Sequence, residues 1–127
     1  MTFRVTLLAL IGYFLCCGGA IAMSDEAGRA LALDIFKQLI EIDTSESGLG
    51  STPAAEAMAQ RFRAAGFAAD DIYIGGPNER KKNLVVRLHG NGKKKPVLLI
   101  GHLDVVEARR EDWTTDPYQF VEKDGYY

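Results

Sequence analysis

PVLLIGHLDVV, at residues 96–106, is the most informative stretch of the chain, and its first half is wholly apolar. Residues 97–100 have the aliphatic content, without polar alternation, of a strand buried on both faces of a mostly parallel sheet. Such sheets bind ligands in the crevice beyond the carboxyl ends of their strands. The stretch therefore predicts an α/β fold with a candidate site where this strand ends.

His102 and Asp104 stand at that end, and if the strand continues, their two-residue spacing aims both side chains to one side. A neutral imidazole binds a divalent transition metal through one nitrogen, and a carboxylate can hold the N–H of the other. The alternative is a satisfied histidine near a strand end, beside an Asp that caps a helix. Because metal sites usually need three or four ligands, the spacing alone leaves both interpretations open.

The composition is that of an ordinary globular protein. The chain has 127 residues, enough for one small domain, with 47% hydrophobic residues, 25% charged residues and a net charge of −2. This balance gives no reason to expect nucleic-acid binding. Basic triplets at 80–82 and 93–95 adjoin Gly, Pro or Asn, which indicates solvated turns rather than a phosphate-binding surface.

Residues 1–22 have the pattern of a signal peptide. Arg4 supplies a positive charge, residues 5–17 are uncharged and apolar, and Ala20-Ile21-Ala22 offers the small-x-small pattern that signal peptidase cuts after. Cleavage would leave Met23 at the new N-terminus. We therefore expect an exported protein, periplasmic or extracellular, whose mature part is residues 23–127 and has no stable membrane partner.

Two alternatives to cleavage after Ala22 remain. Residues 5–23 approach the roughly 20 apolar residues that span a bilayer, so an uncleaved signal would anchor the protein in the membrane. A lipoprotein signal using Cys16 or Cys17 is the other, although Phe14-Leu15 is a poor lead-in to it. Export is expected in every case.

The side chains left in the mature part limit the metals it could bind. Both cysteines, Cys16 and Cys17, lie in the signal segment, so a disulfide or a thiolate site is excluded there. His, Asp and Glu ligands suit zinc, manganese or cobalt. The chain has two histidines, and His89, at a Gly-rich turn, is predicted to be an exposed strand-end residue rather than a ligand.

Two amphipathic helices are expected first. Ser24 can cap a helix that carries an apolar stripe and stops near Asp43. A second helix should start at Thr52-Pro53, bury Met58 and Phe62, and end at Gly66; Arg61 and Arg63 should be solvated.

Strands should follow at residues 71–74, 83–89, 97–100 and 118–122. The turn at Gly90-Asn91-Gly92 makes the second and third of them antiparallel neighbours. Lys123-Asp124-Gly125 is a hairpin signal, and only two residues follow it. We therefore expect the chain to be the N-terminal piece of a longer protein.

From Ser24 onward the chain resembles the co-catalytic zinc aminoacylase/carboxypeptidase family, which includes acetylornithine deacetylase, succinyl-diaminopimelate desuccinylase, glutamate carboxypeptidase and carnosine-type dipeptidases. The motifs that carry the resemblance are LIEIDTS (39–45), AGF (65–67), NLVV (83–86), LIGHLDVV (99–106), Trp113, DPY (116–118) and DGYY (124–127). Their order and spacing are far more specific than His-x-Asp alone. The resemblance implies a three-layer zinc-exopeptidase catalytic domain with a mixed, mostly parallel central sheet, incomplete in this chain.

The resemblance also implies roles for two residues. His102 would bind one of two zinc ions, and Asp104 would be the catalytic-site carboxylate that orients it. The remaining ligands and the general-base glutamate of the family would lie beyond Tyr127. Two departures from the family pattern are Glu107, where Pro is common, and Tyr118, where Phe is common.

The family reaction uses two metals roughly 3.5–4 Å apart to generate hydroxide and polarise the scissile carbonyl, while a glutamate carries the proton to the leaving amine. The leading hypothesis is therefore an exported zinc-dependent exopeptidase or amidohydrolase that cleaves C–N amide bonds of small peptides or N-acyl amino acids. The rival hypothesis is a non-catalytic exported α/β module, either a pseudo-enzyme or a binding domain.

Overall fold

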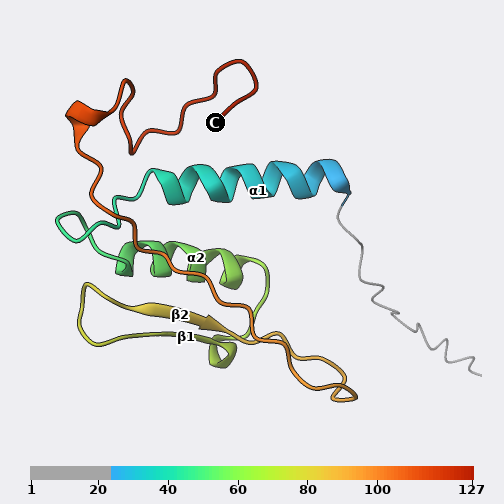
Figure 1. Cartoon of the computed structure of the whole chain (residues 1–127). Helices are drawn as coiled ribbons and strands as arrows, with labels where there is room; N and C mark the ends of the chain where they lie inside the picture. Colours follow the sequence, from blue (N-terminus) through green and yellow to red (C-terminus); the bar gives the residue numbers. More distant parts are fainter. Residues whose placement is uncertain (1–23) are drawn as a thin grey trace, which may run out of the picture.

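The structure is a computed structural model that describes residues 24–127, so the predicted signal peptide at residues 1–22 lies outside it. The order of its longer elements is α1 (Asp25–Ile40), α2 (Thr52–Ala64), β1 (Ile72–Gly75) and β2 (Asn83–Val86). Short 3₁₀ turns cover Ala69–Asp71 and Arg110–Asp112. Figure 1 shows α1 and α2 running in opposite directions, with the β1–β2 hairpin on the far side of α2 from α1. The described part is therefore a mixed α/β structure.

Both helices begin and end close to the predicted positions. The Ser24 hydroxyl accepts a hydrogen bond from the Ala27 N–H at 3.2 Å, which caps the first turn of α1. Helix α1 ends at Ile40, slightly before the expected Asp43. After α2 the chain turns at Gly66, whose φ of +89° is a conformation that glycine adopts without strain.

The hairpin confirms two of the predicted strands and corrects the pairing of one. Strand β1 pairs antiparallel with β2, in a register that sets Ile72 opposite Val86. Strand β2 ends at Val86 rather than at residue 89, and its strand neighbour is β1 instead of residues 97–100. Helix α2 packs on both strands and covers one face of the hairpin.

Residues 97–100 do not form the predicted buried strand. They run without regular secondary structure, and the four residues are 79–88% exposed. A strand buried on both faces requires a hydrogen-bonded neighbour at its edge and a covering element on each face. Within residues 24–127 no strand pairs with this segment, so its apolar composition alone does not bury it.

The buried core of the described residues is made of small side chains rather than the predicted large ones. Ala54, Ala55 and Ala59 of α2 are fully buried, whereas Met58 and Phe62 are only half-buried. Helix α1 has no buried residue, so its predicted core-facing stripe is not covered. A small side chain lets α2 approach its neighbours closely and is itself completely buried. A large side chain at the same contact extends beyond it and stays partly exposed to solvent.

Arg61 corrects the prediction of a solvated face on α2. Its guanidinium pairs with the Asp34 carboxylate at 2.7 Å and donates to the Gln38 side-chain oxygen at 2.5 Å. Both partners lie on α1, so a charged side chain joins the two helices where apolar packing between them is sparse. The pattern of α2 alone could not show that α1 supplies these partners.

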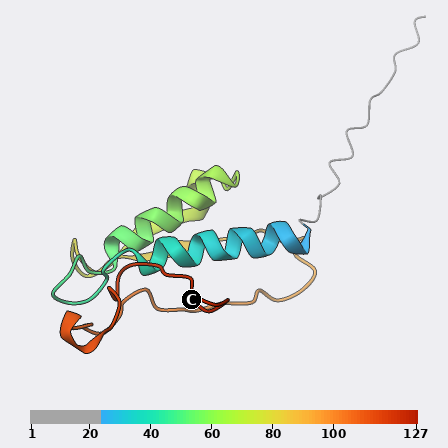
Figure 2. The ribbon, with the colours of Figure 1, turned by 90° about the horizontal axis from the view of Figure 1, so that it is seen from above.

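The end of the chain packs along α1 (Figure 2) through aromatic rings. The rings of Phe36 and Phe120 meet edge to face at 5.5 Å between centroids, and Phe120 stacks on Tyr127 at 5.3 Å. Residues 118–122 form no strand, contrary to prediction. The predicted hairpin turn is present: Lys123 and Tyr126 exchange two backbone hydrogen bonds of 2.9 Å.

Thr52 joins α2 to the loop between the strands. Its buried hydroxyl donates to the Glu79 carbonyl at 2.7 Å and accepts from the Lys82 N–H at 3.1 Å. We expect Thr52→Val to lower the free energy of unfolding by about 1–3 kcal/mol, because it leaves both partners unpaired. Urea denaturation would measure this, with Thr52→Ser as the control that keeps the hydroxyl. Equal midpoints for wild type and Thr52→Val would contradict it.

None of the helices formed by residues 24–127 is both long enough and apolar enough to cross a membrane.

Candidate metal centre

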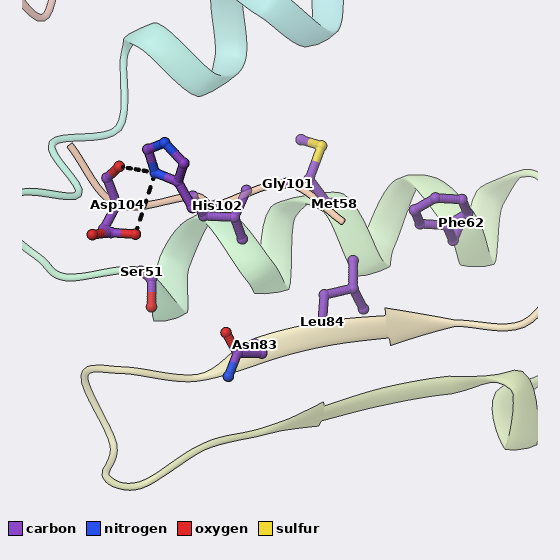
Figure 3. Close-up of a pocket in the computed structure, with 9 residues that line it drawn as sticks. Ser51, Met58, Phe62, Asn83, Leu84, Gly101, His102 and Asp104 are labelled. Atoms are coloured by element: carbon purple, nitrogen blue, oxygen red, sulfur yellow. Dashed lines mark hydrogen bonds and ion pairs between the residues drawn. The ribbon is translucent and has the colours of Figure 1, made fainter. Parts of the chain in front are cut away.

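His102 and Asp104 lie side by side (Figure 3), although the strand on which their spacing was expected to align them does not form. The Nδ1 atom of His102 is 2.8 Å from the backbone carbonyl oxygen of Asp104 and 3.4 Å from a carboxylate oxygen of the same residue. A carbonyl oxygen can only accept, so Nδ1 carries the hydrogen and donates it. A neutral imidazole in this tautomer has its lone pair on Nε2, the atom through which such a ring binds a metal.

The two side chains are open to solvent. The side chain of His102 is 83% exposed and that of Asp104 is 75% exposed. Behind them is a hollow of about 230 Å³ between this segment, α2 and β2, whose walls combine polar and apolar side chains. It is lined by Ser51, Met58, Phe62, Asn83, Leu84 and residues 101–104.

A loop of polar residues after α1 contacts the segment that carries His102. The Thr44 hydroxyl donates to the Leu103 carbonyl at 2.7 Å, and Thr44 is buried. Further along, the backbone N–H of Ser47 donates to the Glu107 carboxylate at 2.8 Å, and the Ser47 hydroxyl donates to its second oxygen. Sequence patterns did not indicate these contacts.

Hydrogen bonds lower the pKa of two carboxyl groups beside this loop. The Ser47 hydroxyl and backbone N–H stabilise the ionised form of Glu107 and hold the pKa of its carboxyl below the ordinary value. Burial raises the pKa of Asp43, but hydrogen bonds from Ser45 and Tyr118 outweigh burial, so the net shift is downward. Both groups are therefore anionic at neutral pH and act as acceptors.

The described residues do not by themselves bring together the ligands of a metal site. No group of three or more His, Cys, Asp or Glu side chains that could hold a metal ion occurs within residues 24–127. Nitrogen Nε2 of His102 fits a zinc ligand, since the ring is exposed and its Nδ1 atom is oriented by the Asp104 carbonyl. A complete zinc site needs further ligands.

His89 lies elsewhere in the structure, at the open end of the hairpin. Its Nε2 atom is 2.6 Å from an Asp71 carboxylate oxygen, and its side chain is 74% exposed. This agrees with the predicted exposed, strand-end position. The Asp71 partner was not predicted, although the antiparallel register brings the start of β1 and the residues after β2 to the same end.

Comparison with known proteins shows which proteins the sequence of this chain is similar to. The chain is 45% identical over 71 residues to succinyl-diaminopimelate desuccinylase of Xanthomonas euvesicatoria pv. vesicatoria, covering 54% of this chain and 17% of the relative. It is 37% identical over 75 residues to Beta-Ala-His dipeptidase of Rattus norvegicus, covering 53% of this chain and 15% of that protein. A probable succinyl-diaminopimelate desuccinylase of Staphylococcus aureus is 48% identical over 50 residues, or 38% of this chain and 12% of the relative.

These similarities confirm the resemblance to the co-catalytic zinc aminoacylase/carboxypeptidase family over about half of the chain. The relatives are named as hydrolases, a desuccinylase and a dipeptidase. The chain spans less than a fifth of their length. No family model and no solved structure matches the chain.

Proposed function

We propose that the full-length protein is an exported zinc-dependent exopeptidase or amidohydrolase that hydrolyses the C–N amide bond of a small peptide or an N-acyl amino acid. Residues 23–127 would form the N-terminal portion of a three-layer catalytic domain with a mostly parallel central sheet. The observation that carries the proposal is the similarity to a desuccinylase and a dipeptidase, together with a histidine whose Nε2 is left free.

In this proposal His102 is a zinc ligand through Nε2, and Asp104 is the residue that fixes its tautomer and orientation. Two bound zinc ions would supply a hydroxide at neutral pH and polarise the scissile carbonyl; cobalt or manganese are alternatives with the same ligand types. The further ligands would come from residues outside this chain, because residues 24–127 hold no group of three ligating side chains.

The rival, a non-catalytic exported module, is favoured by that same shortage of ligands. The reading frame beyond the Tyr127 codon and a zinc assay of the encoded protein distinguish the two. We expect an open frame, and a purified product that contains zinc and cleaves N-succinyl or N-acetyl amino acids or dipeptides. Activity should be lost with a chelator and restored by zinc. A stop codon, or a metal-free inactive product, would support the rival.

Export is tested separately. We expect protein recovered from the extracytoplasmic fraction to begin at Met23, because signal peptidase would cut after Ala20-Ile21-Ala22. N-terminal sequencing measures this, and an Ala22→Arg variant that spoils the cleavage site is the control. A retained apolar segment at residues 5–17 would mean a membrane anchor.

A further inference from the structure

The segment that carries His102 is attached to the described structure by side chains rather than by a sheet. No backbone–backbone hydrogen bond within residues 24–127 involves residues 96–108. Leu103, which lies between His102 and Asp104, instead has its carbonyl held by the Thr44 hydroxyl at 2.7 Å. Thr44 is only 3% exposed, so water competes little for this hydrogen bond.

A second attachment holds the other end of the segment. Ser47 donates from its backbone N–H and from its hydroxyl to the two carboxylate oxygens of Glu107. Bidentate hydrogen bonds to an ionised group are stronger and more directional than neutral single ones. Thr44 holds the segment at Leu103 and Ser47 holds it at Glu107. Two attachment points fix both the position and the direction of the chain immediately after His102.

The loop that makes these contacts has its own internal support. One carboxylate oxygen of Asp43 accepts from the backbone N–H of Ser45 at 3.0 Å and from its hydroxyl at 2.6 Å. The Arg80 guanidinium donates to the backbone carbonyls of Glu46 at 2.7 Å and Gly48 at 2.8 Å. The loop is therefore held by hydrogen bonds within itself and by the β1–β2 connection.

We propose that Thr44 and Ser47 are positioning residues for His102: by holding Leu103 and Glu107, the loop after α1 sets where the imidazole stands and which tautomer it adopts. The expected effect on zinc binding rests on the proposed function. The physical basis of the inference is independent of that function, because the Nδ1 hydrogen bond of His102 ends on the backbone carbonyl of Asp104. Thr44 holds the carbonyl of Leu103, the residue before Asp104. Movement of the Leu103 carbonyl therefore also moves the Asp104 carbonyl, which accepts the hydrogen bond from His102.

The test compares Thr44→Val, which keeps the shape and removes the hydroxyl, with Thr44→Ser, which keeps the hydroxyl, both in the full-length protein. We expect Thr44→Val to weaken zinc binding and lower kcat by about 10–100-fold, the usual effect of losing a group that orients a ligand, with KM little changed. The visible spectrum of the cobalt-substituted protein should change with it. Thr44→Ser should stay within about threefold of wild type.

Thr52→Val is the matched control for stability, because Thr52 is also a buried threonine that donates to a carbonyl, but its partners belong to the loop between the strands. It should lower stability without changing zinc affinity or the cobalt spectrum. Equal zinc affinity and spectra for Thr44→Val and wild type would overturn the proposal, as would equal losses in Thr44→Ser and Thr44→Val. If Thr44→Val does not fold, Ser47→Ala and Glu107→Gln test the second attachment in the same way.

A metal-free measurement separates failure of this inference from failure of the proposed function. In ¹⁵N-histidine-labelled full-length protein, the His102 ring should show hydrogen on Nδ1 in wild type and Thr44→Ser, and a mixture of tautomers in Thr44→Val. His102→Asn assigns the signal. If wild type binds no zinc, the proposed function fails, and the ring nitrogen shifts still decide the positioning role. An unchanged tautomer in Thr44→Val would overturn that role.

Discussion

Alanine in place of His102 is expected to remove zinc from the full-length protein and to lower kcat/KM by more than about 100-fold, which exceeds the effect of losing an orienting partner. The reason is that Nε2 of His102 is the ligand atom in the proposed site, and alanine has nothing to replace it. Metal content by atomic emission and kinetics on the same preparation measure both effects.

Asp104→Ala should behave differently from His102→Ala. It removes the carboxylate that lies 3.4 Å from Nδ1 but leaves the backbone carbonyl that accepts from Nδ1 at 2.8 Å. More zinc should therefore stay bound, while activity falls by about 10–100-fold. Equal zinc loss in the two variants would make Asp104 a ligand in its own right.

His89→Ala is the matched control, since it removes the other histidine of this chain. Its ring is 74% exposed and pairs with Asp71 at the end of the hairpin, away from the segment that carries His102. Zinc content and kcat/KM should stay near those of wild type. If His89→Ala loses zinc and His102→Ala keeps it, the assignment of the ligand is wrong.

The helices and turns were predictable because their signals are local. Ser24 caps α1 through its own hydroxyl, and Gly66 ends α2 by adopting a positive φ. Residues 123–126 form the predicted turn by exchanging hydrogen bonds across a few positions. In each case the residues that determine the structure are those that adopt it.

For residues 97–100, reasoning from local sequence gave a wrong prediction. Their aliphatic composition indicates what they would do beside neighbouring strands, but composition does not supply the neighbours. In the described structure they stay exposed, and β2 pairs with β1. The burial of a sheet strand is a property of the whole sheet, so this prediction depended on residues far from the strand itself.

The candidate site likewise has one part that local sequence could indicate and one part that it could not. His102 and Asp104 are adjacent because both belong to one short segment, although the strand that was expected to align them does not form. The attachments from Thr44 and Ser47 join residues that are 59 and 60 positions apart, a separation that no local pattern records. Glu107, which looked like a minor departure from the family pattern, makes one of the two. The available signal was the run of hydroxyl and acidic residues after α1, a composition suited to hydrogen bonding in a partly buried loop.

Residues 23–127 by themselves are expected to show no hydrolase activity. A dinuclear site needs several ligands, and residues 24–127 bring no three ligating side chains together, while the exposed His102 would share any zinc ion with solvent. Purified residues 23–127 with added zinc would be assayed against N-acetyl amino acids and dipeptides, with the full-length protein as the positive control. Turnover that survives repurification would mean that this part of the chain assembles a working site from ligands beyond His102, and the role assigned to the rest of the protein would then be wrong.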